Sequence, residues 1–414
     1  MTETIRKTTL PNGVRIVTES ISHVASVALG LWLAAGSRDE TPAQAGLAHF
    51  LEHMLFKGTE KRPSSKDIAD ALEDVGGYLN AFTDREVTCY HARALAEDLP
   101  LSLDVLTDMY RNSLFDPEET ARERKVVLEE IKRRDDDPED IIHDLFAEAL
   151  FDKHPLGLPV IGTSDHVAGF TPENLREFLA QNGGPENLIV AATGNLDHDT
   201  VVAQVEKSLG DLAKTSARKT LPAPAARSGI FVTPRADEQV NFVIGGPSLT
   251  HFDDKRYAAA ILDVILGGSM GSRLFIEVRE RRGLAYSVGS YPQLYREGGY
   301  WAAYGGTSPE TFEECIDVVC TELQKVRAEG VTEEELKRAK TQFRSALIMG
   351  QESMNSRMMR IGKAEAIYDR VAPLDEVSAK IESVTQADVL ELARQLIPES
   401  RDALTLAAVG PLDD

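Results

Sequence analysis

Two histidines and a glutamate near the N-terminus have the types and spacing of a metal site with a proton acceptor. His49 and His53 are four residues apart, so on a helix their imidazoles project from one face, about 40° apart. Two neutral imidazole nitrogens in this arrangement can hold one zinc ion. Glu52 lies at the edge of the same face, where its carboxylate can take a proton from a metal-activated water. The three residues therefore predict metal-assisted hydrolysis, although the apolar residues around them would also suit an ordinary buried helix.

A third, acidic ligand is expected from a second helix. The stretch 116–131 predicts such a helix, because Asp116 suits the N-cap and a proline and two glutamates follow it in the first turn. Glu123 and Glu130 project from nearly one face of this helix, whereas Glu129 points about 100° away. We assign Glu130 as the third ligand and Glu123 as a catalytic-site carboxylate that orients a ligand or contacts the substrate. A helix irregularity would make Glu129 the ligand instead, and that alternative stays open.

These residues resemble the metal site of a known family. His49, Glu52 and His53, in the order H-x-x-E-H, followed by Glu130, are similar to the zinc site of the pitrilysin, insulin-degrading and mitochondrial processing peptidases, which are inverzincins. Similar stretches recur farther along the chain, so the resemblance covers essentially all of it. It implies one Zn²⁺ per chain, held by the two histidines and Glu130, with Glu52 as the general base.

The resemblance also implies which residues bind the substrate. The segment after Gly76 alternates as a half-buried strand does, and the matching strand of the family lies at a sheet edge beside the zinc. A peptide would pair with that edge at Asn80 and Ala81. Farther along, Arg279 and Tyr286 match an Arg–Tyr pair that hydrogen-bonds the substrate backbone opposite the zinc. Tyr286 would also act in catalysis by donating a hydrogen bond to the developing oxyanion.

Length and element order predict two domains. A chain of 414 residues exceeds what one core usually supports. The basic, proline-containing segment 214–228 is predicted to link residues 1–213 to residues 229–414. Both halves open with a β-rich run and later carry a long helix with an acidic start. We therefore predict an α+β fold by tandem duplication: two similar α/β domains, each a mostly antiparallel sheet packed with helices. The first is expected to bind zinc, and the second to be metal-free and to supply Arg279 and Tyr286.

Charge and composition narrow the expected partners. The net charge of −22 either keeps the protein dispersed or attracts basic peptides, and it disfavours nucleic acid, whose phosphates require clustered Lys and Arg. No apolar run is long enough to span a membrane, and the first residues lack the hydrophobic core of a secretory signal. The cysteines Cys89, Cys315 and Cys320 cannot all be paired, which favours reduced thiols in a cytoplasmic protein.

We therefore expect a zinc-dependent endopeptidase that cleaves unstructured peptides. The peptidases that the chain resembles enclose their substrate between four domains, and this chain has two. The resemblance thus implies a homodimer that forms a closed chamber, with Arg279 and Tyr286 of one chain facing the zinc of the other. The main alternative is a non-catalytic peptide-binding or assembly subunit of a heteromeric peptidase. The cleavage preference, the physiological substrate and pairing with a different subunit are left open.

Overall fold

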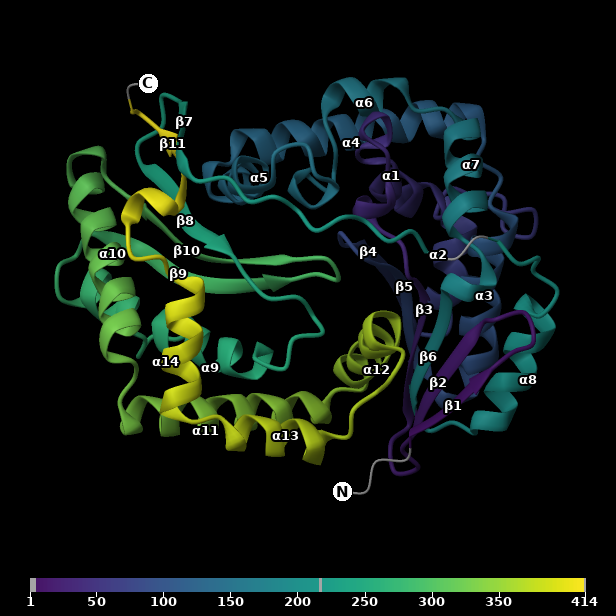
Figure 1. Ribbon diagram of the computed structural model, residues 1–414. Coiled ribbons are helices and arrows are strands. Elements are labelled where there is room, and N and C mark those ends of the chain that lie inside the picture. The colour runs from purple at the N-terminus through teal and green to yellow at the C-terminus, as the bar shows by residue number, and fades with distance from the viewer. Residues whose placement is uncertain (1–4, 216–217, 413–414) are drawn as a thin grey trace. The chain divides into compact units, whose positions relative to one another are not determined.

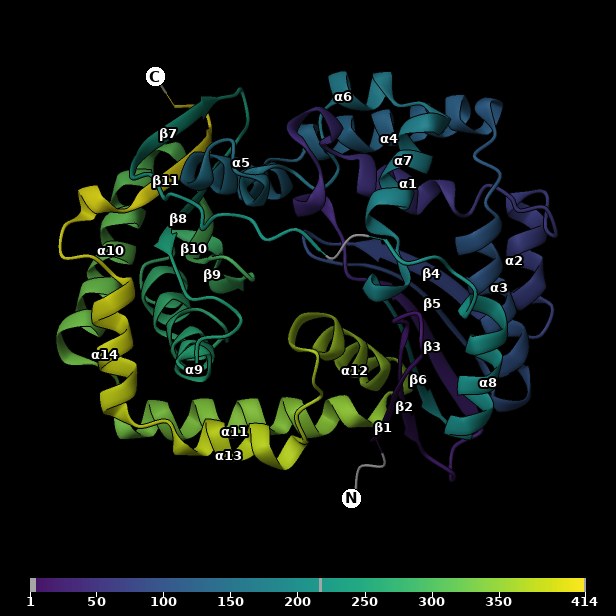
Figure 2. The same cartoon turned by 45° about the vertical axis from the view of Figure 1, so that its right-hand side comes forward.

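The computed structural model describes residues 5–215 and 218–412 as two compact units (Figures 1 and 2). The first unit comprises Met1–Ile131, Pro159–Lys219 and Ile348–Pro373, and the second comprises Lys132–Leu158, Thr220–Leu347 and Leu374–Asp414. Residues 216 and 217 of the predicted linker lie outside the described residues.

The first unit is built on a six-stranded sheet of order β1-β2-β6-β3-β5-β4. All its neighbouring strands are antiparallel except the parallel pair β2 and β6. Its strands are β1 (Ile5–Thr9), β2 (Arg15–Ser20), β3 (Ser26–Leu33), β4 (Tyr78–Thr83), β5 (Thr88–Leu95) and β6 (Leu188–Gly194). Strand β4 ends the order and pairs only with β5, so it is an edge strand.

Helices cover both faces of this sheet, because β3 alternates large side chains between them. Its leucines and Val27 face the core under α1, α3 and α8, whereas Trp32 on the other face packs against Met358 and Ile361 of α12. Figure 1 shows α12 on the face of the sheet opposite to α3 and α8. Gly362 allows this contact, because a Cβ there would lie 2.2 Å from the Trp32 Nε1 atom. The helices of this unit are α1 (Leu47–Met54), α2 (Ser65–Glu73), α3 (Leu99–Asn112), most of α4 (Pro117–Asp136), α6 (Ser164–Gly169), α7 (Pro172–Asn182), α8 (His198–Leu209) and α12 (Met354–Tyr368).

The second unit repeats this architecture. Its five strands have the order β7-β11-β8-β10-β9, which matches β2-β6-β3-β5-β4, and only β7 and β11 are parallel. They are β7 (Gly229–Pro234), β8 (Val240–Pro247), β9 (Ala285–Leu294), β10 (Gly299–Thr307) and β11 (Thr405–Gly410). Its helices are α5 (Pro138–Phe151), α9 (Arg256–Leu266), α10 (Phe312–Glu329), most of α11 (Glu333–Met349), α13 (Leu374–Ser383) and α14 (Gln386–Leu396). The matched sheets confirm the predicted duplication of two mostly antiparallel α/β domains.

The two units differ from the continuous ranges 1–213 and 229–414 expected from the sequence, because each contains a helix from the other half. Helix α5 belongs to the second unit, where its Phe146 and Leu150 pack against β8 and β11. Helix α12 belongs to the first unit, as described above. An amphipathic helix must bury its apolar face, but nothing in its own sequence specifies which sheet covers that face.

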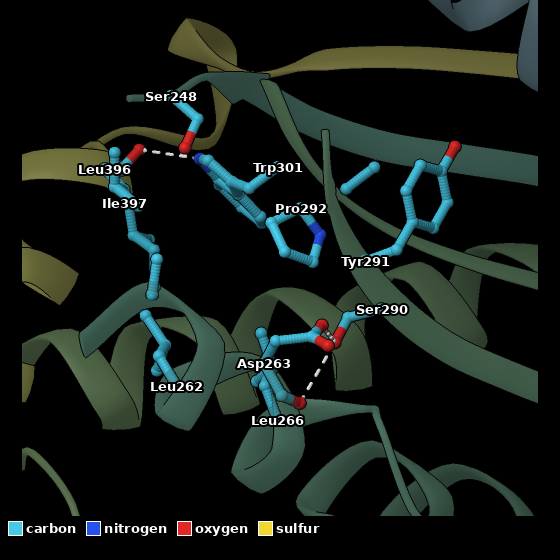
Figure 3. Close-up of a pocket in the computed structure, with 12 residues that line it drawn as sticks. Ser248, Leu262, Asp263, Leu266, Ser290, Tyr291, Pro292, Trp301, Leu396 and Ile397 are labelled. Atoms are coloured by element: carbon cyan, nitrogen blue, oxygen red, sulfur yellow. Dashed lines mark hydrogen bonds between the residues drawn. The ribbon is translucent and has the colours of Figure 1, made fainter. Parts of the chain in front are cut away.

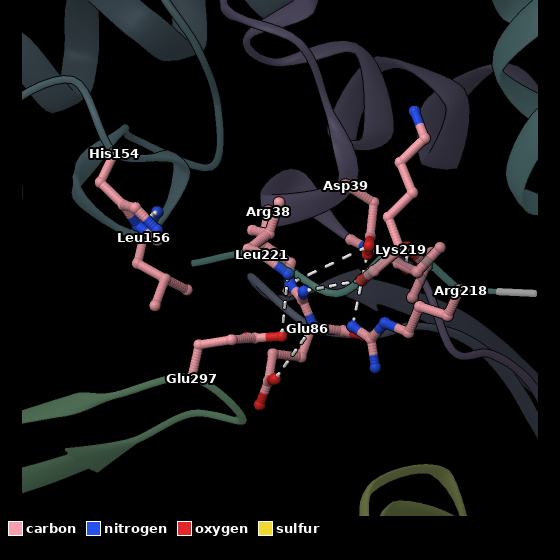
Figure 4. Close-up of polar contacts among 12 residues, drawn as sticks. Arg38, Asp39, Glu86, His154, Leu156, Arg218, Lys219, Leu221 and Glu297 are labelled. Carbon is pink, nitrogen blue, oxygen red and sulfur yellow. Dashed lines mark hydrogen bonds and ion pairs between the residues drawn. The ribbon is translucent and has the colours of Figure 1, made fainter. Parts of the chain in front are cut away.

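The described residues of the predicted linker form no helix or strand between α8 and β7. Two of them, Arg218 and Lys219, are nevertheless held by hydrogen bonds. The Arg218 Nη2 atom donates to the Glu86 carbonyl oxygen (2.6 Å) and to the Asp39 carboxylate (3.3 Å). Arg38, whose side chain is fully buried, donates from Nη2 to the carbonyl oxygen of Lys219 (3.1 Å; Figure 4). Hydrogen bonds with buried partners therefore hold Arg218 and Lys219 against the first unit, although neither lies in a helix or strand.

A cavity of about 30 Å³ lies in the core of the second unit, between α9, the strands β9 and β10, and the end of α14 (Figure 3). Asp263 of α9 is the one charged side chain among its lining residues, and Ser290 donates a hydrogen bond to its Oδ1 atom (2.6 Å). Burial raises the pKa of Asp263 to about 6 in spite of this hydrogen bond.

Cys89, Cys315 and Cys320 form no disulfide in this structure. Across residues 5–215 and 218–412, no helix combines the length and the apolar composition needed to cross a membrane.

Candidate metal centre

Helix α1 presents the H-x-x-E-H motif on its partly exposed side. It begins after Gly46, whose φ of +96° is a left-handed conformation that favours glycine. A Cβ at this position would also lie 2.6 Å from the carbonyl oxygen of Ile161. The opposite side of the helix is anchored in the core of the first unit by Leu47, Ala48, Phe50, Leu51 and Met54. The apolar residues around the motif thus orient the metal-binding face; they do not bury it.

The structure brings the three predicted ligands together within the first unit. One ligand atom each from His49, His53 and Glu130 lies within 4.8 Å of the others, the only such group of three among the described residues. The Glu130 Oε2 atom is 3.5 Å from His53 Nε2 and 4.0 Å from His49 Nε2. Two ligands of a tetrahedral zinc ion, each about 2.1 Å from the metal, are about 3.4 Å apart. The donor set and its spacing therefore fit zinc after a small contraction.

The two histidines differ in their electrostatic surroundings. Burial and the neighbouring His53 lower the pKa of His49 to about 4, so its imidazole is neutral near pH 7, the form that binds a metal. Burial also acts to lower the pKa of His53, but the hydrogen bond with Glu123 and the nearby carboxylates outweigh it and raise that pKa. A bound metal would replace the proton that these carboxylates favour on His53.

Glu123 contacts a ligand and lies outside the group of three. Its Oε1 atom accepts a hydrogen bond from His53 Nδ1 (2.8 Å), and its Oε2 atom pairs with the Lys57 ammonium group (2.5 Å). Burial raises the pKa of Glu123, but these two partners outweigh burial and keep that pKa below its usual value. The contact turns the His53 Nε2 atom toward Glu130. Of the two alternatives, Glu130 belongs to this group, whereas Glu129 is exposed and lies outside it.

The proposed general base is held by a residue that the sequence did not indicate. Thr83, the last residue of β4, donates a hydrogen bond from Oγ1 to the Glu52 Oε2 atom (2.6 Å). Burial raises the pKa of Glu52, and this hydrogen bond opposes the shift. Strand alternation places Thr83 on the same face of β4 as Ala81. This was the only sequence signal that could have placed Thr83 near the site, and it is weak. The sequence analysis also missed Lys57, because its ion pair with Glu123 joins two segments that are far apart in the chain.

Asn80 and Ala81 lie on the edge strand β4, which packs against α1. The Asn80 Oδ1 atom accepts a hydrogen bond from the backbone N–H of Ala81 (2.8 Å), and its Nδ2 atom donates to the Tyr78 hydroxyl (2.8 Å). The Asn80 side chain therefore covers a backbone donor that an added strand could use.

Arg279 and Tyr286 lie in the second unit and contact each other. Arg279 belongs to a short π-helix (Phe275–Glu280), and its guanidinium lies 4.8 Å from the centre of the Tyr286 ring. Gly283, with a φ of +64°, follows this helix and leads into β9, so the predicted interruption between the two residues is present. Tyr286 is 79% exposed.

A duplicated α/β fold with an H-x-x-E-H helix in its first half defines a class of zinc metallopeptidase, and comparison with known proteins agrees. Residues 15–164 match the family model Insulinase (Peptidase family M16), and residues 169–343 match Peptidase M16 inactive domain. The chain belongs to peptidase family M16, which confirms the resemblance drawn from its motifs.

Relatives and solved structures cover nearly the whole chain. An uncharacterized zinc protease of Streptomyces coelicolor is 43% identical over 99% of this chain and 90% of its own length. One of Bacillus subtilis is 38% identical over 98% of both chains. A protease from Helicobacter pylori superposes with a TM-score of 0.91 at 21% identity, over 99% of this chain and all of that one. A peptidase M16 inactive domain structure from Pseudomonas fluorescens gives the same TM-score at 20% identity, over 99% and 98%. These two structures support the fold alone.

Proposed function

We propose that the protein is a zinc-dependent endopeptidase that hydrolyses unstructured peptides. The observation that carries the proposal is the group of His49, His53 and Glu130, with the partly buried carboxylate of Glu52 on the helix of the two histidines. Relatives named zinc proteases support both the metal and the reaction. The alternative of a non-catalytic subunit is the weaker one, because the first unit contains every expected ligand and the expected base.

A bound zinc ion would be held by His49, His53 and Glu130, and it would supply Lewis acidity and lower the pKa of a water molecule. Glu52, held by Thr83, would accept a proton from this water as the water oxygen bonds to the scissile carbonyl carbon. The same carboxyl would return the proton to the amine nitrogen as the C–N bond breaks. Glu123 would keep the His53 ring oriented throughout.

The free edge of β4 suits an extended peptide. A substrate carbonyl would take over the Ala81 N–H that the Asn80 side chain now covers, and strand pairing would hold the backbone with little regard to side chains. Only an unfolded segment can offer its backbone in this way, which is why we infer unstructured substrates. Arg279 would bind the substrate backbone, and Tyr286 would donate to the oxyanion.

We further propose that these two residues act on the zinc site of a second copy of the chain in a homodimer, whose closed chamber would exclude folded proteins by size. We also propose that the protein is cytoplasmic, because three unpaired cysteines suit a reducing compartment.

The substitution Glu52→Gln tests the proposal. It keeps the shape of the side chain but removes the base, so cleavage of a quenched fluorescent peptide should fall roughly 10²–10⁴-fold while zinc content stays the same. Glu130→Gln should lower zinc content, and Glu129→Gln on the same helix is the matched control that should retain both zinc and activity. Full activity of Glu52→Gln would refute the mechanism, and loss of zinc in Glu129→Gln alone would refute the ligand assignment.

A further inference from the structure

A buried carboxylate holds the N-terminus of the zinc-binding helix. Glu40 is only 6% exposed, and its two oxygens accept different backbone N–H groups: Oε2 from Gly46 (2.9 Å) and Oε1 from Ala48 (2.6 Å). The first N–H groups of a helix have no partner within it. The residue at the N-cap is Gly46, which has no side chain to bond them, so Glu40 takes the place of a capping side chain.

The backbone just before Glu40 is hydrogen-bonded to the turn between β4 and β5. The N–H groups of Ser37 and Arg38 donate to the carbonyl oxygens of Asp84 (3.3 Å) and Arg85 (2.9 Å), and the Glu40 N–H closes the intervening 3-10 turn on Ser37 (3.3 Å). Gly36 lets the two segments approach, since a Cβ there would lie 2.1 Å from the Asp84 carbonyl oxygen. A bulkier residue at position 36 would push this turn away.

The same hairpin also reaches the proposed base directly. Thr83 immediately precedes Asp84, and it donates to Glu52 in the middle of α1. Helix α1 is therefore tied to the β4–β5 hairpin at two points: through Glu40 at its N-terminus and through Thr83 at Glu52. The apolar face of α1 already packs in the core, and these two separated attachments further restrict how the helix can shift or rotate relative to the hairpin.

We propose that Glu40 is a positioning residue that sets the zinc ligands of α1 in register with the edge strand β4. This inference rests on the proposed function, because the register matters only if the helix binds zinc and β4 binds the substrate. Loss of the Glu40 contacts would let the first turn of α1, which carries His49, shift relative to Glu130 and to a peptide paired with β4. Both zinc affinity and the turnover of a bound peptide would then decrease.

Zinc competition with a chromophoric chelator, together with the absorption spectrum of the Co²⁺-loaded protein, tests this role in the full chain. We expect Glu40→Ala to weaken zinc binding about tenfold or more and to change the Co²⁺ bands. We also expect kcat to decrease by a larger factor than KM changes. Glu40→Gln keeps one acceptor and should be intermediate. The matched control is Asp197→Asn, which removes a carboxylate that caps α8 through Thr200 (2.8 Å) and should leave zinc affinity within about twofold.

Several results would overturn the inference. Unchanged zinc affinity and Co²⁺ bands in both Glu40 variants would do so, as would an equal loss in Asp197→Asn, since a general loss of stability would then explain the effect. If Glu40→Ala does not fold, the comparison rests on Glu40→Gln against Asp197→Asn. Failure of the wild-type protein to bind either metal would instead refute the proposed function itself.

Discussion

At the scale of single residues, the candidate centre depends as much on the side chains behind the ligands as on the ligands. His53 can bind a metal through Nε2 only if its ring stays turned toward Glu130, and the Glu123 carboxylate holds Nδ1 on the far side of the ring. Lys57 pairs with the other oxygen of Glu123, and together with His53 it keeps the pKa of that carboxyl below its usual value. Such partners raise the basicity of a histidine ligand and reduce its freedom to rotate.

Glu123→Gln is therefore expected to weaken zinc binding by about 10–100-fold without removing a ligand. The amide keeps one oxygen acceptor but loses the charge that attracts Lys57 and polarises His53. Chelator competition at neutral pH measures the effect, and Glu119→Gln, on a partly exposed residue of the same helix, serves as the control. Zinc binding as tight as that of the wild-type protein would show that Glu123 does not orient His53.

At the scale of elements, the two repeats use the same position of the fold for different purposes. Helix α1 follows β3 and carries the H-x-x-E-H motif, whereas α9 follows β8 at the matching place in the second repeat and has no such motif. Helix α9 instead buries Asp263 beside a small cavity, with Ser290 as its hydrogen-bond partner (Figure 3). A carboxyl group in such surroundings favours its protonated form.

Asp263 should make the second unit less stable as the pH rises. Its folded pKa of about 6 lies above the ordinary value of 3.8, so its contribution to stability is fully present below about pH 4 and is lost as the pH rises through 6. Asp263→Asn stays neutral and should gain up to about 3 kcal/mol over the wild-type protein between these limits. Thermal unfolding at several pH values measures the difference, with the exposed Asp254→Asn as the control. A difference between Asp263→Asn and wild type that is independent of pH would contradict the assignment.

At the scale of the whole molecule, each half of the chain contributes a helix to the unit formed mainly by the other half. Each sheet is covered on one face by a helix from the opposite half, α12 on the first and α5 on the second. The Arg279–Tyr286 pair belongs to one unit, and the proposed zinc ligands belong to the other. In the proposed homodimer, the pair completes the site of the partner chain and not that of its own chain.

Mixing two inactive variants tests that arrangement. In the proposed homodimer, a Glu52→Gln chain paired with a Tyr286→Phe chain contains one intact site, because the intact base and the intact tyrosine meet across the interface. Random pairing should thus restore about a quarter of wild-type activity, measured with the quenched peptide after co-refolding. Each variant mixed with itself is the control. Absence of any recovery in verified mixed dimers would refute the arrangement between chains.

Several features follow from the sequence because they depend on local geometry. The helix period alone places His49 and His53 on one face, and the same period aligns Glu123 with Glu130. The repeated order of strands and helices indicated the duplication, and the basic proline-containing segment lies where the described chain passes between β7 and α8. None of these conclusions requires knowledge of which element packs on which.

Tertiary structure decided what depends on contacts between distant segments. The choice between Glu129 and Glu130 requires the rotation of α4 against α1, which no single helix encodes. Glu40 and Thr83 reach the zinc helix through hydrogen bonds between segments that local pattern does not connect. The exchange of α5 and α12 was likewise invisible, because an apolar helix face indicates that it must be covered and not which sheet covers it. The sequence determined the chemistry that the residues can perform, and the packing determined which of them meet to perform it.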